Sequence, residues 1–349
     1  MKKLLIISTN TVHVLNYINL INSYFNDILF ITDVKNDQLK YGNLRTIYTE
    51  FSIKKPLLFY KSIGIIRKAI KEFNPTIIHS HQITTNSLLT MLANKEIQKP
   101  ILFTAWGSDI LFTPSQGYLY RTMVRYILQN AEYFTSDSKY MGEVMSHIAG
   151  KPLNILIANF GINITESLKD EKQNIIYSNR QLMSFYRIDK IIKAFGKFVG
   201  KSNLDKWKLV IGAEGDEKEK LVALSDSLKI SEYIEFVGWL EKEQNSYYYN
   251  IAKYYISIPE SDATSISLLE AMAAGCIPIL SDLPANREWV EDGVNGVIVS
   301  DLESNFIVKA LEIDILKAQS INKQIIKKDG TKEANRLKFI SFYEQIISA

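Results

Sequence analysis

The 349-residue chain is poor in the residues that build disulfide frameworks and zinc sites, with one cysteine, Cys276, and four histidines. A lone cysteine forms no internal disulfide and the histidines lack metal-ligand spacing, so both of those classes are excluded. No Asp-x-Asp pair occurs, which argues against a diphosphate held through a metal, and we expect neither metal nor cofactor. The first loop contains no glycine, which argues against a dinucleotide fingerprint.

Long hydrophobic runs are also missing. The N-terminus reads MKKLLIISTN, in which two lysines precede a short apolar run. This run is too short for a signal peptide or a membrane span, so we expect a buried first strand there. The single cysteine fits a reducing compartment, and we expect a cytoplasmic protein.

Charge of one sign does not dominate the chain, but it is unevenly distributed. The net charge is only +3, and the composition, 46% hydrophobic and 23% charged, is that of a globular protein. Residues 1–165 contain 17 Lys and Arg against 10 Asp and Glu, whereas the remainder contains 24 against 28. This excess indicates an anionic partner on the first half, unless the lysines are simply solvated.

Short apolar, β-branched runs recur with helix-length segments between them. Because these runs do not alternate with polar residues, they predict strands buried on both faces of a parallel sheet. The predicted strands are 4–8, 27–32, 76–80, 101–105, 133–137 and 154–158, then 174–178, 208–212, 233–238, 254–258, 276–280 and 296–300. The pattern predicts an α/β fold with two doubly wound parallel-sheet domains.

The length of the chain favours two domains over one. We expect a first domain over residues 1–165 and a second over 166–331, with the boundary near the polar stretch 165–174. Residues 332–349 have a helical pattern, in which Leu337, Ile340, Tyr343 and Ile347 are spaced by three and four residues. We expect this terminal helix to pack back on the first domain.

The stretch SDATSISLLEAMAAGCIPILSD, residues 261–282, has the strongest functional pattern. It predicts a loop after a buried strand, a helix from about Ser267 to Ala274, and a stop at Gly275. Asp262 lies in the loop and Glu270 in the first helical turn, whose free amides form an anion site. Two carboxylates that bind hydroxyl groups on either side of a phosphate would suit a nucleotide sugar. Ser267-x-x-Glu270 is also a capping box, which needs no ligand, and this pattern alone leaves both interpretations open.

The surrounding residues resemble those of the retaining family 4 of GT-B glycosyltransferases. An acidic residue, seven intervening residues and Glu-Ala-Met-Ala-x-Gly are similar to the family's E-x7-E signature, with Asp262 in place of the first Glu. The further segments that fall in family order are 74–81, 106–111, 135–145, 159–163, 179–195, 210–221, 236–240 and the turn Asp292–Gly296. Each segment is weak evidence, but their order and spacing together are specific.

The resemblance implies two Rossmann-like domains facing a cleft, with the donor on the second and the acceptor on the first. It implies that Glu270 holds the ribose hydroxyls and that Asp262 contacts the donor sugar. Backbone amides near Thr264, Ser265 and Ile266 would face the sugar and the diphosphate. Arg180 matches the family's phosphate-binding arginine, whose guanidinium would stabilise the leaving group. The implied catalytic residues are Arg180, Asp262 and Glu270.

Two positions depart from the family pattern. Tyr186 stands where a Lys is usual, so either Arg187 replaces that charge or the second phosphate contact is weaker. Trp106 stands where a His often lies near the donor sugar, and an indole can only donate one hydrogen bond or stack. We retain Arg187 and Trp106 as candidate donor-binding residues.

Three residues are candidates for the acceptor side. They are His13 after the first strand, His81 at the end of a strand, and Asp109 three residues beyond Trp106. A structural role is the alternative for His13, and capping of the following helix is the alternative for Asp109. Residues 54–71 mix lysines with apolar side chains, and Lys54, Lys55, Leu57, Leu58, Phe59 and Tyr60 form either a membrane contact or a packed helix start.

The sequence thus predicts a retaining, metal-independent glycosyltransferase that uses a nucleoside diphosphate sugar, with UDP slightly favoured. Its acceptor would be a hydroxyl of a bacterial surface-glycan or lipid-linked precursor. An anionic membrane surface at the inner face of the cell membrane is a further expected partner, and nucleic acid is not. The alternatives are a nucleotide-sugar epimerase of the same fold, or a nucleotide-sugar-binding partner that has lost turnover.

Overall fold

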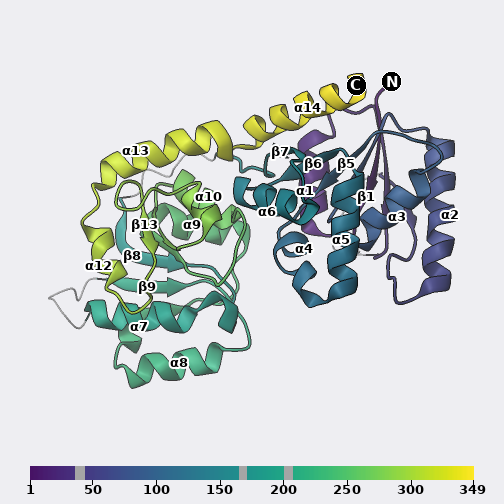
Figure 1. Ribbon diagram of the computed structural model, residues 1–349. Coiled ribbons are helices and arrows are strands. Elements are labelled where there is room, and N and C mark those ends of the chain that lie inside the picture. The colour runs from purple at the N-terminus through teal and green to yellow at the C-terminus, as the bar shows by residue number, and fades with distance from the viewer. Residues whose placement is uncertain (36–43, 165–170, 200–206) are drawn as a thin grey trace. The chain divides into compact units, whose positions relative to one another are not determined.

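The computed structural model describes residues 1–35, 44–164, 171–199 and 207–349. They form two compact units, Met1–Phe160 with Lys332–Ala349, and Gly161–Thr331. Each unit contains one parallel sheet covered by helices, which confirms the predicted fold class (Figure 1). The stretch 165–174, where we expect the boundary, lies partly outside the described residues.

The first unit has a seven-stranded sheet of order β3-β2-β1-β4-β5-β6-β7. Its strands are β1 Lys3–Ile7, β2 Asp27–Thr32, β3 Arg45–Tyr48, β4 Ile77–His81, β5 Ile101–Thr104, β6 Tyr133–Ser136 and β7 Asn154–Ile157. All six predicted strands are present, and β3 is additional. The direction of winding reverses between β1 and β4, which creates a switch point where doubly wound folds bind ligands at the carboxyl ends of the strands.

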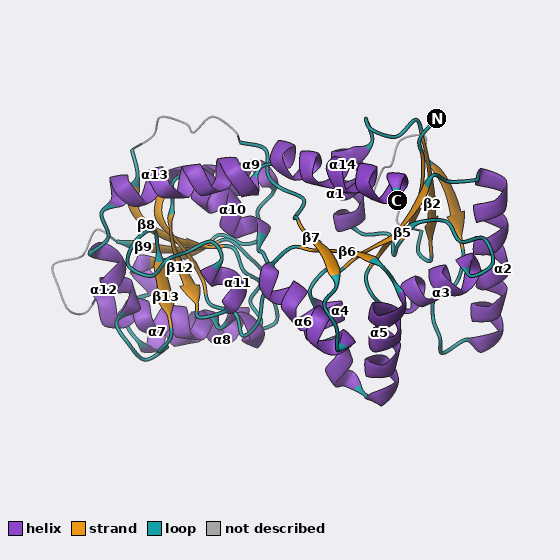
Figure 2. Cartoon of the chain, turned by 45° about the horizontal axis from the view of Figure 1, so that its top comes forward, coloured by secondary structure: helices purple, strands orange, loops and turns teal. Residues whose placement is uncertain are grey.

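Helices bury both faces of this sheet (Figure 2). They are α1 Val12–Ile21, α2 Pro56–Phe73, α3 Thr85–Asn94, α4 Ser108–Leu111, α5 Tyr118–Asn130, α6 Lys139–Ala149 and α14 Lys332–Ser348. Leu4 and Ile6 of β1 pack with α1 and α14 on one face, whereas Leu5 and Ile7 pack with α2 and α3 on the other. This two-sided burial explains why the strands read as continuous apolar runs.

The terminal helix α14 packs within the first unit, but through a different face from the predicted one. Its buried hydrophobic residues are Phe339, Phe342, Tyr343 and Ile346, whereas Leu337 is 55% exposed. The rings of Phe339 and Phe342 bury more apolar area than Leu337 and Ile340 would, and they decide the rotation of the helix, with Tyr343 common to both faces. Of the four predicted positions, only Tyr343 is fully buried.

The second unit has a six-stranded sheet of order β10-β9-β8-β11-β12-β13. Its strands are β8 Gln173–Ser178, β9 Lys208–Ile211, β10 Ile234–Phe236, β11 Ala252–Ser257, β12 Ile277–Ser281 and β13 Val297–Val299, at the six predicted places. All described pairings are parallel, and the winding reverses between β8 and β11. This second switch point positions the candidate donor residues.

Helices also cover both faces of the second sheet. They are α7 Ile188–Val199, α8 Lys218–Ser227, α9 Lys242–Ile251, α10 Ile266–Ala273, α11 Pro284–Arg287, α12 Phe306–Leu311 and α13 Ile315–Ile325. Residues of α7, α8 and α12 share one core with alternate strand residues, and residues of α9 and α10 share the other. Among the described residues, no helix combines the length and apolarity needed to cross a membrane.

Candidate functional site

Three candidate donor residues meet at the switch point of the second sheet. Arg180 follows β8, and Asp262 lies in the loop after β11. The Arg180 Nη2 donates to Asp262 Oδ2 at 2.7 Å, and its Nη1 donates to Ser265 Oγ at 2.9 Å. The side chains of this ion pair are 14% and 21% exposed. The structure therefore brings together Arg180, Asp262 and Ser265 at the carboxyl edge of a doubly wound sheet.

Helix α10 begins at this cluster. Its N-cap is Ser265, whose hydroxyl does not cap the helix but accepts the hydrogen bond from Arg180. Ser267 is therefore the second helical residue, and the capping-box interpretation of Ser267 and Glu270 is wrong, because that box requires Ser267 to precede the helix. The helix ends before Gly275, which has φ of +83°, as the predicted stop requires.

Both carboxylates of the cluster lie in environments that disfavour their charge. Burial raises the pKa of Asp262, while the Arg180 guanidinium acts in the opposite direction. Burial also raises the pKa of Glu270, while Lys242 and a hydrogen bond with Tyr249 act against that rise. Desolvated carboxylates at an open sheet edge are typical of functional sites.

A hydrogen-bond network beneath α10 has no counterpart in the sequence predictions. Asn179 Nδ2 lies 2.8 Å from Tyr249 Oη and 3.3 Å from Ser267 Oγ, and it also donates to Asn245. The Tyr255 hydroxyl donates to Asn179 Oδ1 at 3.2 Å. Asn179 therefore fixes the first turn of α10 relative to β8. A sequence pattern can indicate that these tyrosines are buried, but it does not identify the partner of a hydroxyl group.

Tyr186 lies where the family usually has a phosphate-binding lysine, and Arg187 follows it. Tyr186 contacts Arg180, and Arg187 contacts the loop after β11. The Arg180 guanidinium lies over the Tyr186 ring, 4.7 Å from its centroid, which is a cation–π geometry. Arg187 has left-handed backbone with φ of +55°, and its Nε is 3.6 Å from Glu260 Oε1. Tyr186 thus supports the first cation, and Arg187 supplies a second cation at the same sheet edge.

Thr264, in the loop between Asp262 and α10, is held by a contact with Trp289. It is buried, and its Oγ1 lies 3.3 Å from the indole Nε1 of Trp289. Trp289 precedes the predicted turn Asp292–Gly296, which is closed by a hydrogen bond from Gly293 N to Gly296 O. Asn295 of this turn donates from Nδ2 to the Trp289 carbonyl at 3.0 Å, which fixes Trp289 and thereby the loop ahead of Ile266.

The first unit contains a cluster of rings at its own switch point. The indole Nε1 of Trp106 donates to His81 Nδ1 at 3.3 Å, and the His13 ring lies 5.2 Å from the Trp106 ring. His13 is exposed, Trp106 is partly buried and His81 is fully buried. Burial lowers the pKa of His81 to about 3, with a smaller contribution from His13. His81 therefore lies beneath Trp106, a departure from its predicted acceptor-facing place.

Asp109 also differs from its predicted place. It is 2% exposed, and its two oxygens accept the backbone N–H groups of Ile83 at 2.7 Å and Trp106 at 2.9 Å. Its carboxylate joins the loops after β4 and β5 instead of facing solvent. Asp109 does not cap α4 either, because no side-chain cap precedes that helix.

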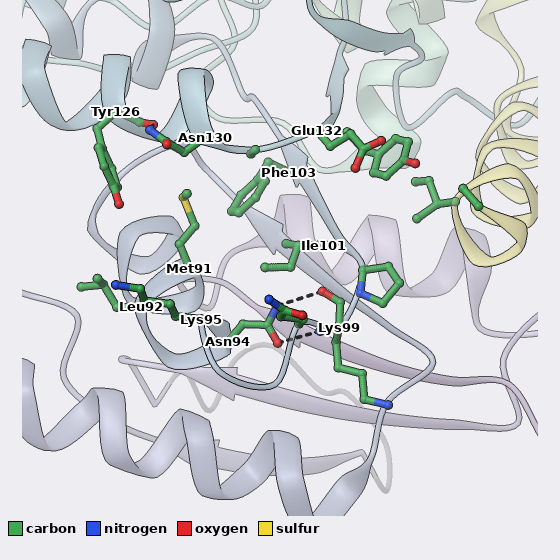
Figure 3. A pocket seen from close by; sticks show the side chains of 16 residues that line it. Met91, Leu92, Asn94, Lys95, Lys99, Ile101, Phe103, Tyr126, Asn130 and Glu132 are labelled. Carbon is green, nitrogen blue, oxygen red and sulfur yellow. Dashed lines mark hydrogen bonds between the residues drawn. The ribbon is translucent and has the colours of Figure 1, made fainter.

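A pocket of about 690 Å³ lies at the opposite edge of the first sheet, before β5 and β6 (Figure 3). Met91, Ile101 and Phe103 line its interior, and Lys95 and Lys99 lie at its margin. None of the candidate site residues lines it. Because doubly wound folds bind substrates at the carboxyl ends of strands, we do not assign the donor or the acceptor to this pocket.

The described part of the chain contains no group of three or more His, Cys, Asp or Glu side chains that could hold a metal ion. Cys276 is buried and lies against Lys172, with 3.7 Å between Nζ and Sγ. It packs in the core beside α10 and has no place in the candidate site.

The two doubly wound parallel sheets, of seven and six strands, define the class of the protein as a GT-B fold. Known structures have the same architecture at low identity. Anabaena HepE, solved with UDP, gives a TM-score of 0.81 at 12% identity, covering 99% of this chain and 100% of that chain. The lipopolysaccharide outer core galactosyltransferase WaaB gives 0.74 at 16% identity, covering 98% and 99%. These likenesses establish the fold alone.

Family models match almost the whole chain. The glycosyl transferases group 1 model matches residues 159–330, and the glycosyl transferase 4-like model matches residues 2–138. The chain belongs to the group 1 glycosyltransferase family.

Two curated relatives are alpha-monoglucosyldiacylglycerol synthases. That of Streptococcus pneumoniae is 23% identical over 271 residues, covering 71% of this chain and 61% of the relative. That of Acholeplasma laidlawii is 30% identical over 149 residues, covering 42% of this chain and 37% of the relative. The chain thus spans less than two thirds of the length of either relative.

Proposed function

We propose that this protein is a retaining, metal-independent glycosyltransferase that transfers a sugar from a UDP-sugar to a hydroxyl of a lipid-linked or surface-glycan precursor. The observation that carries the proposal is the cluster of Arg180, Asp262 and Ser265 at the start of α10, with Glu270 one turn further on. A cation, free helix-terminal amides and two carboxylates are the groups that a nucleoside diphosphate sugar requires.

Each group has a task that its chemistry supports. The Arg180 guanidinium binds the diphosphate and stabilises the negative charge that grows as the sugar leaves. The first amides of α10 bind the same phosphates, because the helix dipole favours an anion there. Glu270 accepts the ribose hydroxyls, and Asp262 accepts a hydroxyl of the donor sugar. Arg187 adds a second cation for the diphosphate.

A lipid acceptor is supported by the named relatives, both of which are synthases of a glucosyldiacylglycerol. It is also supported by the exposed surface of the first unit. At the start of α2, Leu57 is 86% exposed, and Leu58 and Tyr60 are also exposed, whereas Phe59 packs in the core. No acidic residue occurs between residues 51 and 71. Such a surface suits the interface of an anionic membrane.

A second surface of the same character follows β5. Phe112, Tyr118 and Leu119 are exposed, and Arg121 and Arg125 lie on the exposed side of α5. Residues 110–131 contain no acidic residue. Helix α2 follows the end of β3, and α5 follows the end of β5 after the short helix α4, so both surfaces come after the carboxyl ends of parallel strands. The two surfaces therefore share one edge of the unit, and we propose that this edge contacts the membrane.

The test combines binding with turnover. Thermal unfolding with UDP, GDP, ADP and CMP identifies the base, since a ligand at 100 times its Kd stabilises the native state by about 2.7 kcal/mol. Transfer from UDP-glucose to diacylglycerol in anionic vesicles is then followed by NMR of the product, in which retention gives an α-linkage. An epimerised free donor would favour the epimerase alternative. UDP binding without transfer or hydrolysis for any UDP-sugar would favour a non-catalytic partner.

A further inference from the structure

Trp106 has already used its only hydrogen-bonding group inside the protein. Its Nε1–H donates to His81 Nδ1 at 3.3 Å, and an indole has no acceptor and no second donor. Because Trp106 is only partly buried, its apolar ring is the part of the side chain that remains for a ligand. We propose that Trp106 recognises a sugar ring by stacking and that His81 is the positioning residue that fixes the indole; the stacking part rests on the proposed function.

His81 is itself held rigidly. Its ring stacks on that of His79 at 4.2 Å with an interplanar angle of 25°, and the Tyr17 ring lies edge-on at 4.5 Å. Both nitrogens of His79 have partners, since Nδ1 is 2.9 Å from the Tyr17 hydroxyl and Nε2 is 2.5 Å from Thr104 Oγ1. These rings are fully buried, so His81 cannot turn without disturbing the core.

The protonation state of His81 follows from this contact. Because the indole can only donate, Nδ1 of His81 accepts and the proton lies on Nε2. Nε2 is buried and has no hydrogen-bond partner in the described part of the chain. An unpaired buried N–H destabilises the fold, whereas an apolar side chain would fill the same space without that cost. Because Nε2 has no partner, we infer that the role of His81 lies in its Nδ1, which accepts the indole N–H of Trp106.

The backbone of Trp106 is fixed as firmly as its side chain. Asp109 accepts the Trp106 N–H and also the Ile83 N–H, which follows the strand that ends at His81. The same two loops are therefore joined twice, once through Asp109 and once through the indole. Because both its backbone and its indole are held, Trp106 presents one ring orientation to a ligand. A fixed ring orientation is the condition for placing a sugar productively.

The positioning role is tested by NMR of the protein labelled with 15N at tryptophan. Histidine Nδ1 is best replaced by the side-chain oxygen of asparagine, so H81N should keep the Trp106 indole N–H resonance close to its wild-type position. H81L removes the acceptor and should shift that resonance alone among the four tryptophans. A Trp106 resonance that does not respond to H81L would overturn the positioning role.

The functional part is tested by transfer from UDP-glucose to diacylglycerol vesicles. We expect W106L to lower kcat about 100-fold, as a misplaced substrate does, and H81L and W106F to lower it about tenfold each. H81N should stay within about threefold of wild type, and UDP affinity should stay within about twofold for all variants, because the UDP residues lie in the second unit. The double variant H81L/W106F should be no slower than either single variant, because both remove the same contact.

Other outcomes are decisive. If the losses of H81L and W106F multiply in the double variant, His81 does not act through Trp106 and the proposal fails. If W106L transfers sugar at the wild-type rate, stacking is refuted. If the wild type transfers no sugar although the indole resonance responds to H81L as expected, the proposed function and the stacking role fail, while His81 remains the positioning residue of Trp106.

Discussion

The buried histidines of the first unit should make the fold sensitive to mild acid. Burial lowers the pKa of His79 well below its usual range and that of His81 to about 3. In the unfolded chain each imidazole takes up a proton near pH 6.5. A histidine whose pKa is lowered by folding stabilises the native state most above pH 6.5, and this contribution is lost progressively as the pH falls toward the folded pKa.

The size of the loss can be worked out for each ring. Between pH 7 and pH 5.5, proton uptake by each such histidine stabilises the unfolded chain relative to the native state by about 1.2 kcal/mol. Two rings therefore lower the free energy of unfolding by about 2.5 kcal/mol. For a unit of this size that corresponds to a fall in Tm of about 5–10 °C. H81L removes one of the two groups and should reduce the fall in unfolding free energy by about 1.2 kcal/mol.

Hydrogen exchange of the first unit's strand amides is the suitable assay, because the two units need not unfold together. The control is H147Q, which removes a histidine from the exposed side of α6 and should leave the fall unchanged. If H81L lost stability between pH 7 and pH 5.5 as steeply as the wild type, His81 would not be buried in its neutral form, and the predicted acid sensitivity would be refuted.

The remaining predictions concern the second unit and the membrane. E270A should weaken UDP binding by about 1.5–3 kcal/mol in calorimetry, as expected for loss of a charged hydrogen bond, whereas E288A, at the residue that follows α11, should not; normal UDP binding by E270A would remove Glu270 from the site. R180A should lower kcat more than it raises the donor KM, because the leaving-group charge is greatest in the transition state, and an effect on KM alone would contradict this role. Activity should persist in excess EDTA, and strict dependence on Mg²⁺ or Mn²⁺ would exclude the metal-free site. Sedimentation with anionic vesicles should fall for K54E/K55E and for R121E/R125E, and also with added salt, but not for K218E/K220E on α8; equal sedimentation of all variants would exclude this edge as the contact.

The strands were predictable because two-sided burial leaves a direct trace in the sequence. Runs such as DILFIT and KLVIG need no partner to be recognised, and the strands formed there as Asp27–Thr32 and Lys208–Ile211. The edge strand Arg45–Tyr48 has no buried residue, so it lacks the apolar run that identifies the others. Its pairing with β2 comes from tertiary context.

The positions of the candidate site residues were predictable only where a local motif defines them. The loop with Asp262 and the helix with Glu270 follow from the chain itself, and Arg180 from its place after a strand. The stacking of Tyr186 on Arg180 and the support of α10 by Asn179 depend on which strands become neighbours. The same holds for Asp109 and His81, whose side chains are polar in sequence but buried in the fold, because their partners come from a different strand end.

The ion pair between Arg180 and Asp262 has a consequence for ligand selection. Without a ligand, each group neutralises the other at 2.7 Å. In the function we propose, a diphosphate takes Arg180 from Asp262, and a sugar hydroxyl then becomes the new partner of that carboxylate. Inorganic phosphate or UDP alone satisfies only one side of this exchange and leaves Asp262 without its cation. Only the intact donor supplies a partner for both Arg180 and Asp262, so the ion pair would favour the donor over its fragments. Re-formation of the pair after transfer would help to release UDP.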